Sequence, residues 1–426
     1  MMDDVQIGGR VDDPWPRSID TVVIGAGQAG LLMSWHLQRA GRSHVVLDRR
    51  ETLGGGWQDR WDAFRLVGPN WTTDLPGYPY DGSDPDAFMT RDEVAARMRA
   101  YADVISAPIH RATEVLRLST AGAGSRRFHI ETSHGPIDAD DVIVATGAFH
   151  VPKIPAAAAG ISPRLRQLHA HHYRNDTDLP QGGVLIVGSG QTGVQLADEL
   201  RSAGREVVLS VGHCGRAPRR YRGHDFFWWF RRLVTHGPEL GLPLPSVDRL
   251  ADPRLRFACN PHLSGHAGGH DTNLRQMARD GLRLAGRFES AAGERARFSA
   301  DLGENLRFAD EFFDARFRDL IDTFAERAGM SVPDDDRQWP HFEPPELTEL
   351  SLDGSGIGTV LWTTGYAPDY GWLDLPIFDE AGLPRHRRGI SEVPGLSFIG
   401  LLWQHTNASA NLLGVFADAE YLVSRW

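Results

Sequence analysis

The sequence predicts an α/β protein with two Rossmann-like dinucleotide-binding domains, the second inserted in the first. Two observations lead to this prediction. An apolar, β-branched run near the N-terminus ends in the spacing Gly-x-Gly-x-x-Gly and passes into a helical pattern, and the same arrangement recurs from residue 184. We expect a first domain over residues 1–175, a second over 176–345 with an insert at about 212–300, and a return to the first over 346–426.

Composition limits the classes of function. The 426 residues carry a net charge of −11, which argues against nucleic acid as a partner. No apolar run reaches the roughly 18 residues of a membrane span, and residues 1–18 are too polar for a leader or an anchor. Cys214 and Cys259, the two cysteines, form no Cys-x-x-Cys pair. We therefore expect no disulfide framework and a cytoplasmic setting.

The first glycine motif has the composition of a pyrophosphate-binding turn. Gly25 permits the tight turn, Gly27 permits close approach of a phosphate, and Gly30 permits close packing of helix and strand. The helix is expected from Gln28 to residue 40, with its free N–H groups toward the anion. A second strand ends at Asp48, roughly 20 residues after Gly25, where a carboxylate accepts from a ribose hydroxyl.

Further along, glycine and tryptophan residues indicate a second loop against the same ligand. The run Gly54–Gly56 permits close backbone approach, at Gly55 in particular, and the adjacent Trp57 can cover a flat group. A helix is expected over 89–102, followed by strands over 114–118 and 128–132. An apolar strand over 141–147 then ends in Thr146 and Gly147, where a parallel sheet opens onto its ligand.

The second glycine motif repeats the first. Gly188, Gly190 and Gly193 follow a β-branched run, and Gln191 and Thr192 begin a helix that is expected to end at residue 200. One molecule that binds two dinucleotides suggests electron transfer between them.

The two nucleotide-binding units differ at the position expected to contact the ribose. Ser210 stands where the first copy has Asp48, so no carboxylate repels a 2′-phosphate there. Four arginines follow on the next loop and offer a cradle for that phosphate, with a solvated basic loop as the alternative. They are Arg216, Arg219, Arg220 and Arg222. These residues favour NADPH over NADH as the second dinucleotide.

The remainder of the chain holds packing elements and a return to the first domain. The aromatic run 226–230 is expected to pack in a core, with a pocket wall or contact with a membrane surface as the alternatives. The nearby histidines are assigned no metal. A helix is expected over 310–328. A strand ending in Thr364 and Gly365 is expected to rejoin the first domain, followed by a strand ending at Gly400 and a helix over 407–422.

Over nearly its whole length the chain resembles the flavin-containing monooxygenases, which depend on FAD and NADPH. Both glycine motifs, the Gly-Gly-x-Trp of residues 54–57 and the two Thr-Gly turns carry the resemblance. Closer still, it looks like a bacterial branch of FAD-dependent oxidoreductases. His169, Tyr173 and Arg174 match the end of the family's signature between its two nucleotide folds, whereas the signature's Phe and Gly are replaced here by Pro163 and Leu165.

The resemblance implies FAD at the first motif and NADPH at the second, with Asn70 near the reactive edge of the flavin. It implies that NADPH reduces the flavin, that dioxygen adds as a flavin hydroperoxide, and that a small soft nucleophile is oxygenated at nitrogen or sulfur. Baeyer–Villiger oxygenation and a homodimer stay open. Two alternatives also stay open: an NAD(P)H–flavin reductase or oxidase without oxygenated product, and a nucleotide-binding redox sensor.

Overall fold

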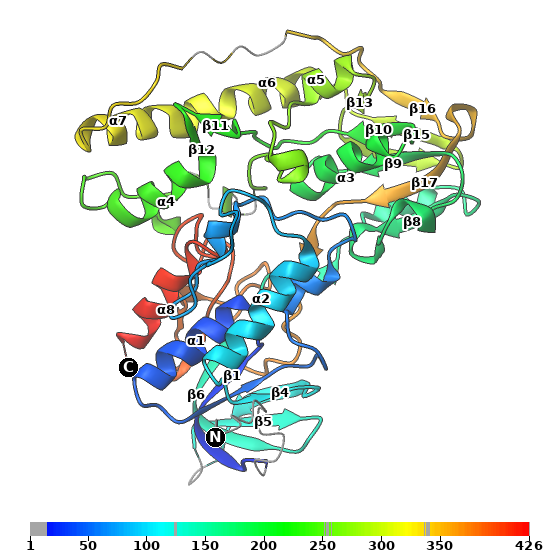
Figure 1. Ribbon diagram of the computed structural model, residues 1–426. Helices are drawn as coiled ribbons and strands as arrows, with labels where there is room; N and C mark the ends of the chain where they lie inside the picture. The colour runs from blue at the N-terminus through cyan, green and yellow to red at the C-terminus, as the bar shows by residue number, and fades with distance from the viewer. Residues whose placement is uncertain are drawn as a thin grey trace, which may run out of the picture.

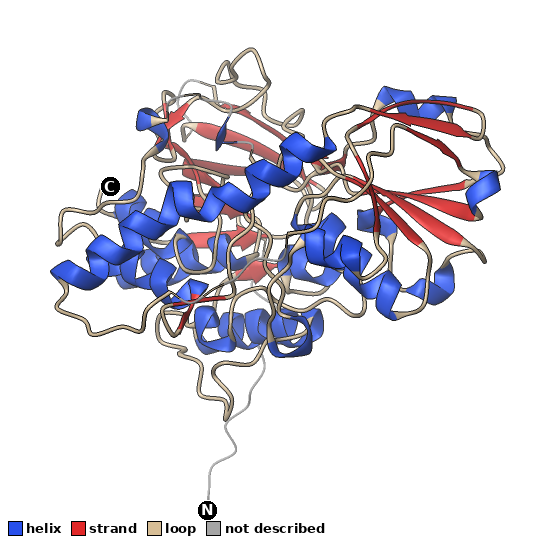
Figure 2. Cartoon of the chain, turned by 90° about the horizontal axis from the view of Figure 1, so that it is seen from above, coloured by secondary structure: helices blue, strands red, loops and turns tan. Residues whose placement is uncertain are grey.

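A computed structural model describes residues 15–122, 126–250, 252, 255–256, 258–335, 337 and 341–425. Figure 1 shows two bodies, one above the other, and Figure 2 shows from above that each contains its own sheet with helices against it. Most of the polar N-terminal segment considered above lies outside the described residues. Within the described residues, no helix combines the length and the apolar character that crossing a bilayer requires.

The lower body is built on a sheet with a parallel core. The core order is β3 (Ile109–His110), β2 (His44–Leu47), β1 (Ser18–Ile24), β6 (Ile137–Val144) and β21 (Leu396–Phe398). The antiparallel strands that extend it are β4 (Val115–Thr120), β5 (Phe128–Thr132), β19 (His386–Arg387) and β20 (Ile390–Ser391). Helices α1 (Gln28–Arg39), α2 (Arg91–Val104) and α8 (Val415–Val423) pack together, with apolar side chains of all three in one core.

The upper body repeats the strand–turn–helix unit in a five-stranded parallel sheet. Its order is β13 (Arg283–Ala285), β10 (Val207–Ser210), β9 (Gly183–Val187), β17 (Ile357–Trp362) and β8 (Arg166–His169). Helix α3 (Gln191–Ser202) follows the second glycine motif. An antiparallel sheet comprises β14 (Phe288–Ala292), β15 (Arg295–Phe298) and β16 (Glu349–Ser351). Two dinucleotide folds are thus present, as the sequence predicts.

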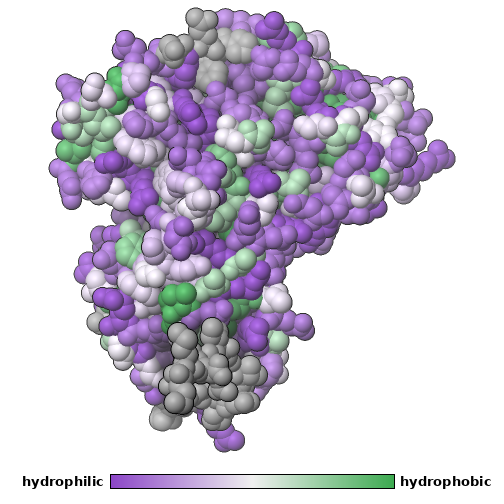
Figure 3. Space-filling view, in the orientation of Figure 1, coloured by the Kyte–Doolittle hydropathy of each residue, from purple (hydrophilic) through white to green (hydrophobic). Residues whose placement is uncertain are grey.

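The pairing of β17 corrects the domain boundaries. The strand expected to rejoin the first domain lies between β8 and β9 in the second sheet, because its apolar run is buried on both faces there. The chain leaves the lower body at β7 (Val151–Pro152) and returns at β18 (Tyr366–Ala367), and these two strands pair with each other. The chain thus crosses between the two bodies near residues 153 and 365, whereas the sequence predicts domain boundaries at 175 and 345. Figure 3 shows the waist that results.

The aromatic run of the insert forms core, as expected. It begins α4 (Phe226–His236), which follows the hairpin of β11 (Arg220–Tyr221) and β12 (His224–Asp225). Trp229 is fully buried against a long helix that begins earlier than expected, at Leu302. That helix comprises α6 (Leu302–Phe313), a π-helical turn over Asp314–Arg318 and α7 (Asp319–Arg327). A shorter helix, α5 (Leu274–Arg279), precedes it.

Two helix ends show how local chemistry sets the boundaries. Thr90 and Glu93 form the reciprocal capping box expected at the start of α2. The C-terminal helix, by contrast, begins at Val415 and not at 407. A Cβ on Gly414 would lie 2.1 Å from the carbonyl oxygen of Ala408, so the chain folds tightly back on itself before α8 begins.

Candidate nucleotide sites and the junction between them

The first glycine motif forms a closed turn between β1 and α1. Gly25 has φ +108°, and a Cβ there would lie 2.6 Å from the carbonyl oxygen of Ala145. A Cβ on Gly30 would lie 1.8 Å from the carbonyl oxygen of Gly25. The Asp48 carboxylate accepts from the backbone N–H of Ala26 at 2.7 Å and of Arg50 at 2.9 Å. Strand end and turn are thus fixed to each other, with Asp48 8% exposed.

A second glycine loop lies directly against this turn. A Cβ on Gly55 would lie 3.1 Å from the Cα of Gly27, so only backbone fits between the two loops. Gly55 begins the 3₁₀ helix η1 (Gly55–Asp59), which places Trp57 against the cores of both bodies. After β6, Thr146 leads to Gly147, where an added Cβ would meet nothing within 4 Å. The end of the sheet is therefore open beside the turn, as a nucleotide requires.

Two buried polar atoms, one at the start of α1 and one in the segment after η1, have no partner among the described residues. The Gln28 amide nitrogen donates to the carbonyl oxygen of Ala410 at 3.1 Å, whereas its Oε1 is buried without a hydrogen bond. Asn70 begins the 3₁₀ helix η2 (Asn70–Thr73) and donates to the carbonyl oxygen of Asp84 at 2.9 Å, while its Oδ1 is likewise unpartnered. Buried acceptors of this kind require a donor, which a bound group can supply. Gly400 follows β21 and lies beside Ala29 of α1.

The second glycine motif reproduces the first turn, with Thr363 in place of Ala145. Gly188 has φ +107°, and a Cβ there would lie 2.9 Å from the carbonyl oxygen of Thr363. A Cβ on Gly193 would lie 1.9 Å from the carbonyl oxygen of Gly188. A Cβ on Gly190 would lie 3.8 Å from that of Cys259, which belongs to the segment over the turn. In both bodies the first glycine of the turn therefore packs against the residue that follows a neighbouring parallel strand, β6 in the lower body and β17 in the upper body.

The segment over the second turn is held by polar contacts. Gln191 donates to the carbonyl oxygen of Leu263 and accepts from its N–H at 3.1 Å. His262 Nε2 lies 2.5 Å from the carbonyl oxygen of Ser189. Thr192 lies half-buried in the first turn of α3. These contacts fix the position of the segment above the N-terminus of α3.

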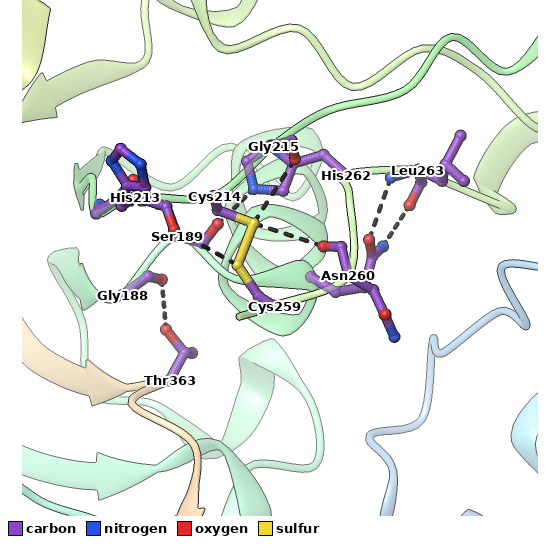
Figure 4. Close-up of a disulfide and its surroundings, with 12 residues drawn as sticks. Gly188, Ser189, His213, Cys214, Gly215, Cys259, Asn260, His262, Leu263 and Thr363 are labelled. Carbon is purple, nitrogen blue, oxygen red and sulfur yellow. Dashed lines mark hydrogen bonds between the residues drawn. A yellow bond between two sulfur atoms is a disulfide. The ribbon is translucent and has the colours of Figure 1, made fainter. Parts of the chain in front are cut away.

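Cys214 and Cys259 form a disulfide, which corrects the expectation that the chain has none. Figure 4 shows it beside Gly188 and Ser189, joining the loop after β10 to the segment that includes His262 and Leu263. The two cysteines are 45 residues apart, so their proximity depends on the fold and not on local spacing.

The arginine loop does not meet Ser210. Ser210 Oγ donates to the carbonyl oxygen of Gly286 and accepts from the N–H of Phe288, both at 2.9 Å. Arg219 is buried and pairs with Asp225 at 2.6 Å, and it also donates to the carbonyl oxygen of Val67. Arg216 pairs with Asp310 and Arg222 with Asp322. Three of the four arginines of the expected cradle are thus paired with carboxylates, and two of these carboxylates, Asp310 and Asp322, lie about 100 residues further along the chain.

The residues of the interdomain signature join the two bodies. His169 ends β8; its Nε2 lies 3.0 Å from the carbonyl oxygen of Gly365, and its Nδ1 accepts from the N–H of His171 at 3.1 Å. The proton is therefore on Nε2, and burial lowers the pKa of His169. Arg174 donates to the carbonyl oxygen of Asp59 in η1 at 2.9 Å. Thr364 donates to the carbonyl oxygen of Lys153 in the other crossing strand.

Tyr173 has a partner that the sequence did not indicate. Its side chain is fully buried, and its hydroxyl donates to Glu199 Oε1 of α3 at 3.0 Å. Burial raises the pKa of Glu199 to about 7. Glu199 stands in an ordinary amphipathic helix, so only the tertiary contact singles it out. Among the described residues, no three His, Cys, Asp or Glu side chains cluster as metal ligands do.

Comparison with known proteins agrees with this geometry. A family model described as pyridine nucleotide-disulphide oxidoreductase matches residues 22–222. An uncharacterized CzcO-like oxidoreductase of Geobacillus kaustophilus is 31% identical over 410 residues, which cover 95% of this chain and 97% of that protein. A flavin-containing monooxygenase, FMO GS-OX-like 7 of Arabidopsis thaliana, is 26% identical over 52% of this chain and 55% of its own length.

Solved structures share the architecture. A flavin-containing monooxygenase from Stenotrophomonas maltophilia superposes with a TM-score of 0.63 at 22% identity, covering 96% of this chain and 98% of that one. The two-body arrangement with one nucleotide fold in each body is therefore a known fold.

Proposed function

Because this chain belongs to the CzcO-like oxidoreductases, within the flavoproteins that resemble flavin-containing monooxygenases, we propose that it is an NADPH-dependent FAD monooxygenase acting on a soft nitrogen or sulfur nucleophile. It is a flavin-dependent oxidoreductase, and its two nucleotides are FAD and NADPH. A cytoplasmic setting and a homodimer stay predictions.

The residues of the first turn fit FAD. Gly27 and Gly55 leave room for backbone alone, so a pyrophosphate can approach the N-terminus of α1 without meeting side chains. Asp48 keeps acceptor capacity for a ribose hydroxyl beyond its two backbone contacts. The unpartnered oxygens of Gln28 and Asn70 are available to donors of a bound group.

The residues of the second turn fit a second dinucleotide, with one change of assignment. Gly188, Gly190 and Gly193 repeat the steric pattern of the first turn. Because Arg219 is paired elsewhere, we assign the 2′-phosphate of NADPH to Arg287. A Cβ on Gly212, just past β10, would lie 3.9 Å from the Cγ of Arg287. The Arg287 side chain is 65% exposed, and in the described part of the chain its guanidinium pairs with Asp301.

When bound, FAD and NADPH supply hydride transfer and the activation of dioxygen. The chain's own residues hold the two bodies in register and exclude water. His169 fixes β8 to Gly365, Arg174 fixes the segment between β8 and β9 to η1, and Trp57 fills the space between the two cores. A soft nucleophile needs no general base, and the overall reaction of a sulfide consumes dioxygen, NADPH and a proton and yields sulfoxide, NADP⁺ and water.

The observation that carries the proposal is the junction itself. Two equivalent glycine turns belong to two bodies joined by a pair of crossing strands, and the interdomain signature residues contact both sides. The test measures NADPH consumption, hydrogen peroxide release and sulfoxide formation with purified, FAD-loaded protein and thioanisole. We expect sulfoxide to account for most of the NADPH consumed.

The alternative function, an NADPH oxidase, predicts a different ratio of hydrogen peroxide released to NADPH consumed. If peroxide equals NADPH consumed with every amine and sulfide offered, the protein is an NADPH oxidase and the monooxygenase proposal is wrong. Because a disulfide lies beside the second turn, the same experiment should also test whether the protein is a reductase. Reduction of Cys214–Cys259 by NADPH, followed by thiol counting, identifies that activity.

A further inference from the structure

We propose that a cavity between the two bodies, lined by arginine and tryptophan, is a binding site for aromatic carboxylates, and that these are the preferred substrate class; the second clause rests on the proposed function. The cavity has a volume of about 730 Å³, within the range of small-molecule sites. One wall is the segment around Pro69 and Trp71 of the lower body, and the other is the hairpin and α4 of the insert.

The cavity is positively charged in a protein whose net charge is −11. The described residues that line it include two carboxylates, Asp86 and Asp225, and twice as many arginines. The arginines are Arg219, Arg220, Arg231 and Arg232. Arg219 pairs with Asp225 and Arg231 pairs with Asp74, outside the lining.

Arg220 and Arg232 pair with no carboxylate in the described part of the chain. Two guanidinium groups without counter-ions attract an anion, and their fork geometry suits a carboxylate.

Both walls contain aromatic rings that are stacked with other flat groups. Arg232 lies over the Trp228 ring at 4.6 Å, and Arg231 lies over the Trp71 ring at 5.4 Å. His224 stacks on Trp228 with centroids 3.9 Å apart and planes 9° from parallel. Flat groups therefore already stack at this site, and a planar ring with an attached carboxylate matches both features of the wall.

The position of the cavity connects it to the chemistry. Pro69 and Trp71 line it and flank Asn70, whose Oδ1 is buried without a partner in the described residues. Arg219 links the walls, because it donates to the carbonyl oxygen of Val67 at 2.7 Å and lies over the Phe88 ring at 5.1 Å. A ligand in the cavity thus contacts the segment that the resemblance places beside the flavin.

The test uses three sulfides of one shape: 4-(methylthio)benzoate, 4-(methylthio)benzamide and thioanisole. Sulfoxide formation and saturable quenching of tryptophan fluorescence are measured separately with the FAD-loaded enzyme. We expect the KM of the benzoate to be at least about tenfold below that of the benzamide, as one charge-assisted hydrogen bond implies. Arg220→Gln and Arg232→Gln should each raise the KM of the benzoate about tenfold and leave that of thioanisole unchanged.

Arg39→Gln is the matched control. The Arg39 guanidinium also lies over a partly buried tryptophan, 4.9 Å from the centre of the Trp35 ring, but Arg39 does not line the cavity. This variant should behave as the parent with all three sulfides.

The outcomes separate the two proposals. Turnover of all three sulfides with equal KM, unaffected by Arg220→Gln and Arg232→Gln, overturns the cavity assignment and leaves the monooxygenase intact. Benzoate binding that Arg232→Gln abolishes, without sulfoxide from any compound, keeps the site and overturns the monooxygenase. Competition of NADP⁺ with benzoate assigns the cavity to the nucleotide and overturns the inference, as does absence of benzoate binding and turnover.

Discussion

We propose that one charged residue beside the second turn, Arg287, selects NADPH over NADH. Arg287 lies next to Gly212, and the N–H of the following residue, Phe288, donates to Ser210 at the end of β10. Its guanidinium pairs with Asp301 yet its side chain is 65% exposed. An exposed guanidinium at the ribose end of a nucleotide turn is suited to a 2′-phosphate.

Arg287→Gln should therefore raise the KM for NADPH about 10- to 100-fold and leave that for NADH nearly unchanged, since a charge-assisted hydrogen bond is lost only with the phosphorylated ribose. Steady-state kinetics with both nucleotides measure the ratio. Arg297→Gln, which removes an exposed arginine from β15, is the control. An equal rise with both nucleotides would contradict the assignment.

Glu199 makes stability depend on pH. Its pKa is raised by burial to about 7 in the folded chain, so the folded state binds a proton more tightly than the unfolded state does. The free energy of unfolding should fall as pH rises from about 4.5 to about 7, and Glu199→Gln should remove this fall, making the variant roughly 2 kcal/mol more stable than the parent at pH 8.

Urea unfolding at pH 5 and pH 8 measures the effect. Glu206→Gln, an exposed acid nearby in the chain, should leave the pH dependence in place. A parent whose stability is the same at both pH values would show that the buried carboxyl is not the cause.

At the scale of elements, the strand–turn–helix unit depends on one close contact. The backbone of Gly30 in α1 approaches the carbonyl oxygen of Gly25, and Gly193 of α3 does the same to Gly188. The sequence predicts these units well because both partners of each contact lie within one short motif. It does not predict where α8 begins, because that depends on how residues 408–414 fold back.

Gly30→Ala should lower the free energy of unfolding by at least about 3 kcal/mol, because a Cβ placed 1.8 Å from a carbonyl oxygen forces helix and strand apart. Urea unfolding followed by circular dichroism measures the loss. Gly56→Ala is the control, since its Cβ would meet nothing within 4 Å, and it should change stability by only about 0.5 kcal/mol. Similar losses in both variants would refute the steric argument.

The disulfide is a second element-scale feature. It closes a loop of 45 residues, so its removal should lower the free energy of unfolding by up to about 4 kcal/mol. The Cys214→Ser/Cys259→Ser variant should also raise the KM for NADPH, because the segment over the second turn loses its tether to the loop after β10. Dithiothreitol should lower the melting temperature of the parent and not that of the variant. A parent insensitive to the reductant would mean that the thiols are not bonded in solution.

For the molecule as a whole, the sequence predicts two nucleotide folds because the same glycines, which the backbone of each turn requires, occur twice in the chain. It does not predict the boundary between them. Strand β17 is equally apolar wherever it pairs, and only the parallel register with β9 assigns it to the upper body. Likewise the residue types of His169, Tyr173 and Arg174 are recognisable, whereas Glu199 and the disulfide come together only in the folded chain.

Arg174 couples the two bodies. It donates to the carbonyl oxygen of Asp59 in η1, while the N–H of Asp62 donates back to the carbonyl oxygen of Arg174 at 2.8 Å. Arg174→Ala removes a charged donor worth about 1.5–3 kcal/mol, so states with a separated junction should become about 10- to 150-fold more populated. Water then reaches the space between the bodies, and more of the NADPH consumed should appear as hydrogen peroxide instead of sulfoxide. The ratio of peroxide to NADPH measures this loss, and Arg164→Ala, which removes an arginine 86% exposed just before β8, should leave it unchanged. Unaltered coupling in the Arg174 variant would mean that the crossing strands alone hold the bodies in register, and that the signature arginine serves another purpose.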